Sequence, residues 1–199
     1  MFSTLWRFGG PTSLAAGSLW LLIWLHQRAT HGATATNEMR LVFGLTWLDS
    51  AKFLVVPLIL LLLGVMRLYR RLHPPGGLGR IGGIVTIVGL VLLILGVAAE
   101  FWSFPWGSYA VGFETGLPQV GGLIQALASL LFTIGLIMFT IALVRARIIP
   151  VWAAPVLMVG GVTTFYLTPV SWIPGIAWLL LGAVLWRQRD TASPQEAQV

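Results

Sequence analysis

Six apolar stretches, each close to the length of a membrane span, leave this chain few ways to fold. A helix needs about 20 residues to cross the hydrocarbon core of a bilayer, at about 1.5 Å of rise per residue. With 57% hydrophobic and 9% charged side chains, the chain carries more apolar surface than one water-soluble core buries. We therefore expect an all-α, polytopic membrane bundle of about six transmembrane helices. The predicted spans are residues 8–26, 46–66, 81–102, 121–144, 148–167 and 171–186.

The basic residues fall mainly on one side of this layout. Lys and Arg are enriched in the cytoplasmic loops of membrane proteins, so nine of the twelve on one side predict that both termini lie in the cytoplasm. That side carries Arg7, Arg67, Arg70, Arg71, Arg80, Arg145, Arg147, Arg187 and Arg189, and the other carries Arg28, Arg40 and Lys52. We expect one bundle domain over residues 1–187, with an uncleaved first span, and a polar cytoplasmic tail over 188–199.

Tryptophans support the same boundaries, because the amphipathic indole ring prefers the membrane–water interface. Eight of the ten tryptophans lie near predicted span ends. The two exceptions are Trp20 and Trp178, which fall inside the first and sixth spans.

Small residues recur every seventh position in two neighbouring spans. In lipid, helices associate through close backbone approach, so such stripes predict contact faces. We expect spans three and four to form a tight hairpin, and we expect the sixth span to carry a shorter face of the same kind. The stripes are Gly82, Gly89 and Gly96, then Gly121, Ala128, Gly135 and Ala142, then Gly175 and Gly182.

Charged side chains are missing from the predicted membrane centre, where a charge costs about 2.5–3.5 kcal/mol on insertion scales. Helical rise places Asp49 and Glu100 at the outer boundary instead, near His26. These three residues are the candidate catalytic groups of an outer-face enzyme, if they converge. The competing interpretation is an interfacial ion pair between Lys52 and either Glu100 or Asp49. No spacing typical of metal ligands occurs, so we predict no metal site.

Polar residues and helix breakers supply the candidate ligand-binding positions. Pro57 and Pro155 interrupt spans two and five, which occupy matching places if the chain consists of two inverted halves. Interrupted helices at matching positions are typical of transporter sites, although proline kinks are also ordinary in membrane helices. The further candidates are a polar stripe on span four and two residues at the outer end: Gln125, Ser129 and Thr133, with Lys52 and Tyr166.

The turn between spans two and three is strongly basic. Each basic residue near an anionic leaflet contributes about 1 kcal/mol to the attraction between protein and membrane surface. We therefore expect Arg67, Arg70, Arg71 and Arg80 to contact lipid head groups. Nucleic acid is not an expected partner, because no folded soluble domain presents these residues. The absence of cysteine excludes thiolate ligands, and no histidine lies inside a span to ligate haem, so the sequence names no cofactor.

One segment carries a resemblance. Residues 145–154 (RARIIPVWAA), with Glu100-Phe-Trp before them, resemble segments of uncharacterised small multi-pass bacterial membrane proteins. The resemblance implies a bacterial plasma membrane and no particular activity. Our leading hypothesis is a non-enzymatic accessory or scaffold protein, or a lipid- or small-ligand-binding bundle. Its partners would be membrane lipids, with a partner membrane protein or a second copy also open. A small transporter or channel and the outer-face enzyme are the alternatives.

Overall fold

The computed structural model describes residues 9–31, 45–72, 76–104, 106, 116–166 and 172–191. This part of the chain is mainly helical, and every predicted apolar stretch corresponds to one helix or, for the second stretch, to two. Three segments are long and apolar enough to cross a membrane: Leu48–Arg71, Gly77–Phe101 and Leu117–Arg145. The helices are α2 (Gly9–His31), α3 (Trp47–Lys52), α4 (Val55–Arg71), α5 (Gly77–Phe101), α6 (Leu117–Arg145), α7 (Ala153–Tyr166) and α8 (Ile173–Thr191).

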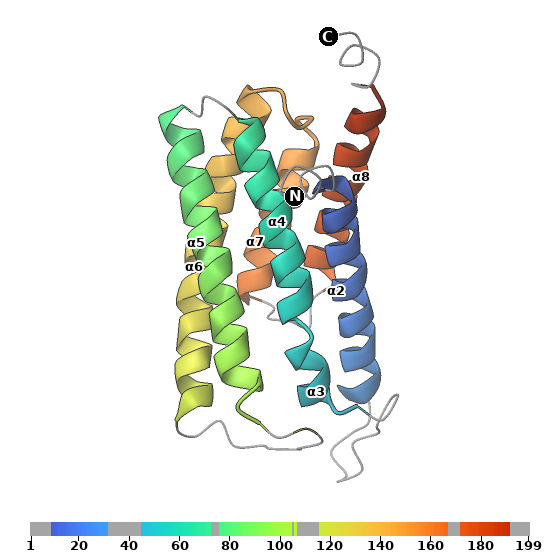
Figure 1. Ribbon diagram of the computed structural model, residues 1–199, viewed down its shortest axis with the longest axis vertical. Coiled ribbons are helices and arrows are strands. Elements are labelled where there is room, and N and C mark those ends of the chain that lie inside the picture. The colour runs from blue at the N-terminus through green and yellow to red at the C-terminus, as the bar shows by residue number, and fades with distance from the viewer. Residues whose placement is uncertain are drawn as a thin grey trace, which may run out of the picture.

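The described helices form a ring of long rods that run in alternating directions (Figure 1). In chain order α2 packs on α4, α4 on α5, α5 on α6, α6 on α7 and α7 on α8, and α8 closes the ring on α2. The start of α2, the end of α4, the start of α5, the turn between α6 and α7 and the end of α8 all lie at the upper end in Figure 1. We call this the arginine end, because Arg67, Arg71, Arg80 and Arg145 lie in the helix turns nearest to it.

Large side chains fill the inside of the ring. Trp20 and Trp178, the two tryptophans away from span ends, are buried in this core. The Trp178 ring lies 6.3 Å from that of Phe132, which joins α8 to α6 across the interior, and Phe139 lies 6.3 Å from Tyr69 of α4. Apolar burial is therefore directed inward, while large apolar side chains such as Leu123 remain exposed on the outer surface.

The tightest contact in the ring joins α5 and α6, along the glycine stripes that predicted it. A Cβ atom added at Gly89 would lie 2.5 Å from the backbone nitrogen of Phe132, and one at Gly135 would lie 2.5 Å from that of Thr86. Real Cβ atoms essentially never come that close to another backbone. Glycine is therefore what lets the two helices approach, and the Thr86 hydroxyl is satisfied within its own helix by donating to the Gly82 carbonyl at 2.7 Å.

The α2–α8 contact uses the same device, with a partner stripe on α2 that the sequence analysis did not identify. A Cβ atom at Gly17 would lie 2.6 Å from the carbonyl oxygen of Gly175, and one at Gly182 would lie 2.6 Å from the backbone nitrogen of Leu14. Glycines on both helices thus lie at the same interface, and the face predicted on the sixth span packs against the first span.

Several predicted boundaries differ from the structure by a few residues, and two of these differences bear on other predictions. Pro155 was expected to interrupt a span, but α7 begins at Ala153, so Pro155 lies in its first turn. A proline there removes no intrahelical hydrogen bond, because the first N–H groups of a helix have no partner within it. At the other end of the chain, α8 continues to Thr191, beyond the predicted start of the polar tail, and residues 192–199 lie outside the described part.

Candidate functional site

An apolar groove with a volume of about 470 Å³ lies between α2 and the α3–α4 segment. Its wall on α2 is formed by Leu19, Leu22 and Ile23. Its opposite wall is formed by the end of α3 and the start of α4, including Phe53 and Val56. Leu22 is 61% exposed and Val56 is 46% exposed, so the groove opens on the outer surface of the ring.

Pro57 creates the break that shapes this groove. Proline has no N–H, so the Phe53 carbonyl cannot receive the usual helical hydrogen bond from position 57. The Val56 N–H instead donates to the Phe53 carbonyl at 3.0 Å, and the chain makes a tighter turn between α3 and α4. As a result the Lys52 carbonyl, which a regular helix would pair with Val56, accepts a hydrogen bond from the Trp102 indole N–H at 3.2 Å. The expected interruption of the second span is present, and Pro57 itself lines the groove.

Two polar residues lie among the apolar walls. His26 near the end of α2 and Ser50 of α3 both line the groove, in the half nearer the end opposite the arginine end. Ser50 is buried and almost all of the groove surface is apolar, so these two residues add little polar surface to the lining.

Next to the groove, α3 holds a buried ion pair. Lys52 Nζ lies 3.3 Å from Asp49 Oδ1, and both side chains are 2% exposed. The other Asp49 oxygen accepts hydrogen bonds from the Thr46 backbone N–H and hydroxyl, while the Asp49 N–H donates back to that hydroxyl. This capping box fixes the start of α3. Lys52 also lies over the ring of Trp106, 4.2 Å from its centroid, an arrangement typical of a cation–π contact.

The second outer carboxylate has a different partner. Gln125 of α6 donates a side-chain hydrogen bond to Glu100 of α5, so these two residues join the ends of the helical hairpin. The ion pair was expected between Lys52 and either Glu100 or Asp49, and the structure forms it with Asp49. Both carboxylates thus have structural partners. Among the described residues, no group of three or more His, Asp or Glu side chains is placed to hold a metal ion.

The remaining candidates from the sequence are dispersed around the ring. Thr133 donates to the Gly161 carbonyl at 3.0 Å and ties α6 to α7, while Ser129 is buried on α6. Pro155 lines a different apolar groove, between α7 and α8, so the two prolines border separate surface grooves. That arrangement offers no support for a shared transport site. Tyr166 ends α7, and its side chain lies outside the described part of the structure.

In the basic turn, Arg70, Arg71 and Arg80 are exposed and Arg67 is partly buried. The side chains of all but Arg67 therefore reach the surface at the arginine end, where the sequence predicts contact with lipid head groups.

Two residues of the site were not identified as functional from the sequence. Trp102 and Trp106 were assigned only as interfacial tryptophans. In the structure the Trp102 indole N–H donates to the Lys52 carbonyl, and the Lys52 ammonium group lies over the Trp106 ring. The available signal was their position after Glu100, at the same predicted depth as Lys52. That depth does not reveal which helix a loop tryptophan will reach.

Comparisons with known proteins identify no significant relative of this chain. No protein-family model matches the chain, and neither the curated proteins nor the solved structures show a significant match. The function must therefore be argued from the groove, the ring and the distribution of charge.

Proposed function

We propose that this chain is a non-enzymatic multi-pass membrane protein that binds one elongated apolar ligand, such as an acyl or prenyl chain, in the α2–α4 groove. Both termini and the arginine end face the cytoplasm of a bacterial cell. Every helix crosses the membrane once, with α3 and α4 sharing a single crossing.

The membrane setting is supported by where charge and apolar surface lie. Three segments are long and apolar enough to span a bilayer, and α7 and α8 contain shorter apolar helices. On α6 the outward-facing Leu123 and Leu127 are 63% and 65% exposed, surface that favours contact with lipid over water. The described charged residues lie toward the ends of the helices, as insertion energies require.

Orientation is tested by labelling single cysteines, which is straightforward because the natural chain has none. Gly76→Cys lies at the arginine end, where an added Cβ meets nothing within 4 Å, and Ser103→Cys is an exposed position at the opposite end. We expect a membrane-impermeant maleimide to label Ser103→Cys on intact cells, and Gly76→Cys only after permeabilisation. The reverse pattern would invert the proposed orientation, and labelling of both sites on intact cells would contradict a membrane-spanning bundle.

The groove is the observation that carries the ligand proposal. It is about 470 Å³ in volume, a size typical of small-molecule sites, and its walls are apolar except at His26 and Ser50. A molecule with a long apolar body matches that lining. The opening toward the outer surface of the ring would let such a molecule enter sideways from the lipid.

Ligand binding is tested with a fluorescent long-chain fatty acid and purified protein in detergent. Leu22→Trp places a large side chain in the groove, whereas Leu123→Trp adds the same side chain at an equally exposed position on α6. In Leu22→Trp the added ring should displace a few methylene groups of the ligand from the groove. Each buried methylene contributes about 0.8 kcal/mol, so binding should weaken by about ten-fold or more. Affinity should be unchanged in Leu123→Trp. Equal affinity in both variants and the natural protein would mean that the probe only partitions into detergent, and the proposal would fail.

A further inference from the structure

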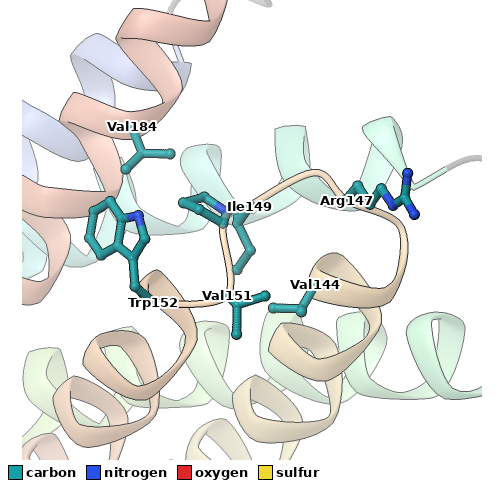
Figure 2. A pocket seen from close by; sticks show the side chains of 7 residues that line it. Val144, Arg147, Ile149, Val151, Trp152 and Val184 are labelled. Atoms are coloured by element: carbon teal, nitrogen blue, oxygen red, sulfur yellow. The ribbon is translucent and has the colours of Figure 1, made fainter.

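A pocket separate from both grooves lies at the arginine end. It has a volume of about 460 Å³ and is formed by the turn between α6 and α7 together with Val184 of α8. Figure 2 shows Trp152 next to Val184 on one side, and Val144 and Val151 on the other, with Ile149 between them.

The end of α6 builds one edge of this pocket through a specific hydrogen-bond pattern. The Ile148 N–H donates to the Leu143 carbonyl and the Arg147 N–H donates to the Val144 carbonyl, both at 2.9 Å. This is the Schellman arrangement, which requires a left-handed residue at the position after the cap. Arg147 occupies that position with φ of 56°, a conformation that a residue other than glycine adopts at a cost of about 1 kcal/mol or more. The turn thus ends the helix abruptly and leaves Arg147 at the pocket edge.

The lining divides into an apolar part and a cationic edge. Arg147 is the only charged residue among those that line the pocket, and its guanidinium group points away from Trp152 (Figure 2). Val151 is 75% exposed and Trp152 is 56% exposed, so the apolar part is open to the surroundings. Arg145 is also exposed nearby, and residues 142–152 contain no acidic side chain. An occupant with an apolar chain and an adjacent negative charge complements this surface.

We infer that this pocket binds an anionic phospholipid of the cytoplasmic leaflet, with an acyl chain against Ile149, Trp152 and Val184 and the phosphate at Arg147. A lipid meets both requirements in one molecule, whereas a free phosphate would leave the apolar walls unused. The inference rests on the proposed membrane setting and orientation but not on the α2–α4 groove.

The test uses the full chain in nanodiscs that contain phosphatidylglycerol and phosphatidylcholine, followed by release into detergent and quantification of retained lipid. We expect retained phosphatidylglycerol to exceed its share in the nanodisc. Arg147→Gln should reduce this retention about five-fold, the equivalent of about 1 kcal/mol for one basic residue at an anionic surface. Arg147→Lys should restore most of it. Arg80→Gln is the matched control, since it removes an exposed arginine at the same end but outside the pocket. Arg80 is expected to attract head groups at the open surface only, so its loss should reduce the lipid retained after release into detergent far less than the loss of Arg147.

The acyl part is tested separately. Val184→Trp should lower the retention of phosphatidylglycerol by filling the pocket, and water-soluble glycerol phosphate should fail to displace the lipid. Equal losses in Arg147→Gln and Arg80→Gln would show a diffuse surface attraction and overturn the inference, as would equal retention of the two lipids or displacement by glycerol phosphate. Failure of the chain to enter nanodiscs at all would instead overturn the proposed membrane setting.

Discussion

The α5–α6 interface and the α2–α4 interface are both built from apolar helices, yet one is closed and the other contains a groove. At the closed interface, glycines let backbones meet, as where a Cβ atom at Gly121 would lie 2.5 Å from the backbone nitrogen of Glu100. At the open interface, Pro57 breaks the helix and leaves about 470 Å³ of space lined by bulky side chains. The spacing of the small residues and the position of one proline account for this difference.

The largest expected effect comes from adding a single methyl group where the backbones of α5 and α6 meet. Gly89→Ala puts a Cβ atom 2.5 Å from the backbone nitrogen of Phe132 and 2.7 Å from its Cα atom, so a helix must move rather than a side chain. We expect a loss of about 3 kcal/mol in the free energy of unfolding, at the upper end of the range for overpacked cores. Unfolding in mixed micelles, followed by circular dichroism, measures it.

The matched control for this variant lies elsewhere on the same pair of helices. At Gly122 the nearest atom to an added Cβ is Glu100 Oε2 at 3.8 Å, which is ordinary contact. Gly122→Ala should therefore be neutral or stabilising by up to about 1 kcal/mol, because alanine favours helix more than glycine does. Similar losses in Gly89→Ala and Gly122→Ala would show that the close α5–α6 approach is not what stabilises this side of the ring.

A smaller effect is expected from the buried ion pair beside the groove. Removing one partner of a buried pair costs about 3–5 kcal/mol when the other charge is left without compensation. Lys52→Met removes the ammonium group, but Asp49 keeps its hydrogen bonds from Thr46, so we expect a loss of about 2 kcal/mol. Thermal unfolding in detergent provides the measurement. Lys52→Arg should retain most of the stability, and a Lys52→Met variant as stable as the natural protein would show that the pair contributes nothing.

The two interfaces also differ in how far the sequence predicts them. The hairpin followed from a period of seven in Gly82, Gly89 and Gly96, because such a stripe has meaning only as a contact face. The groove could not be predicted in the same way. A proline predicts a break in its own helix, but it does not predict which neighbouring helix will leave space beside that break. Trp106 shows the same limit, since its contact with Lys52 depends on a path between helices that has no local pattern.

Pairing partners were predictable in kind but not in detail. Lys52 and Asp49 are three residues apart on one helix, a spacing that brings side chains together, and Glu100 lay at the same predicted depth. The sequence therefore left two acceptors for Lys52. The capping box on Thr46 fixes Asp49 in the geometry that accepts the lysine, and Glu100 is bonded by Gln125 of the hairpin instead.

The smallest effect on stability, with the sharpest effect on the groove, is expected from Pro57→Ala. Alanine supplies the missing N–H, so the Phe53 carbonyl can take its regular partner and α3 can continue into α4. The Lys52 carbonyl would then return to Val56 and lose the Trp102 indole, so gains and losses in hydrogen bonding offset each other within about 1 kcal/mol. A straighter helix narrows the space beside Leu22, and binding of the fluorescent fatty acid should weaken by several fold while the unfolding midpoint hardly moves. Undiminished binding would mean that the proline break does not make the groove, and that the open interface owes its shape to the bulky side chains alone.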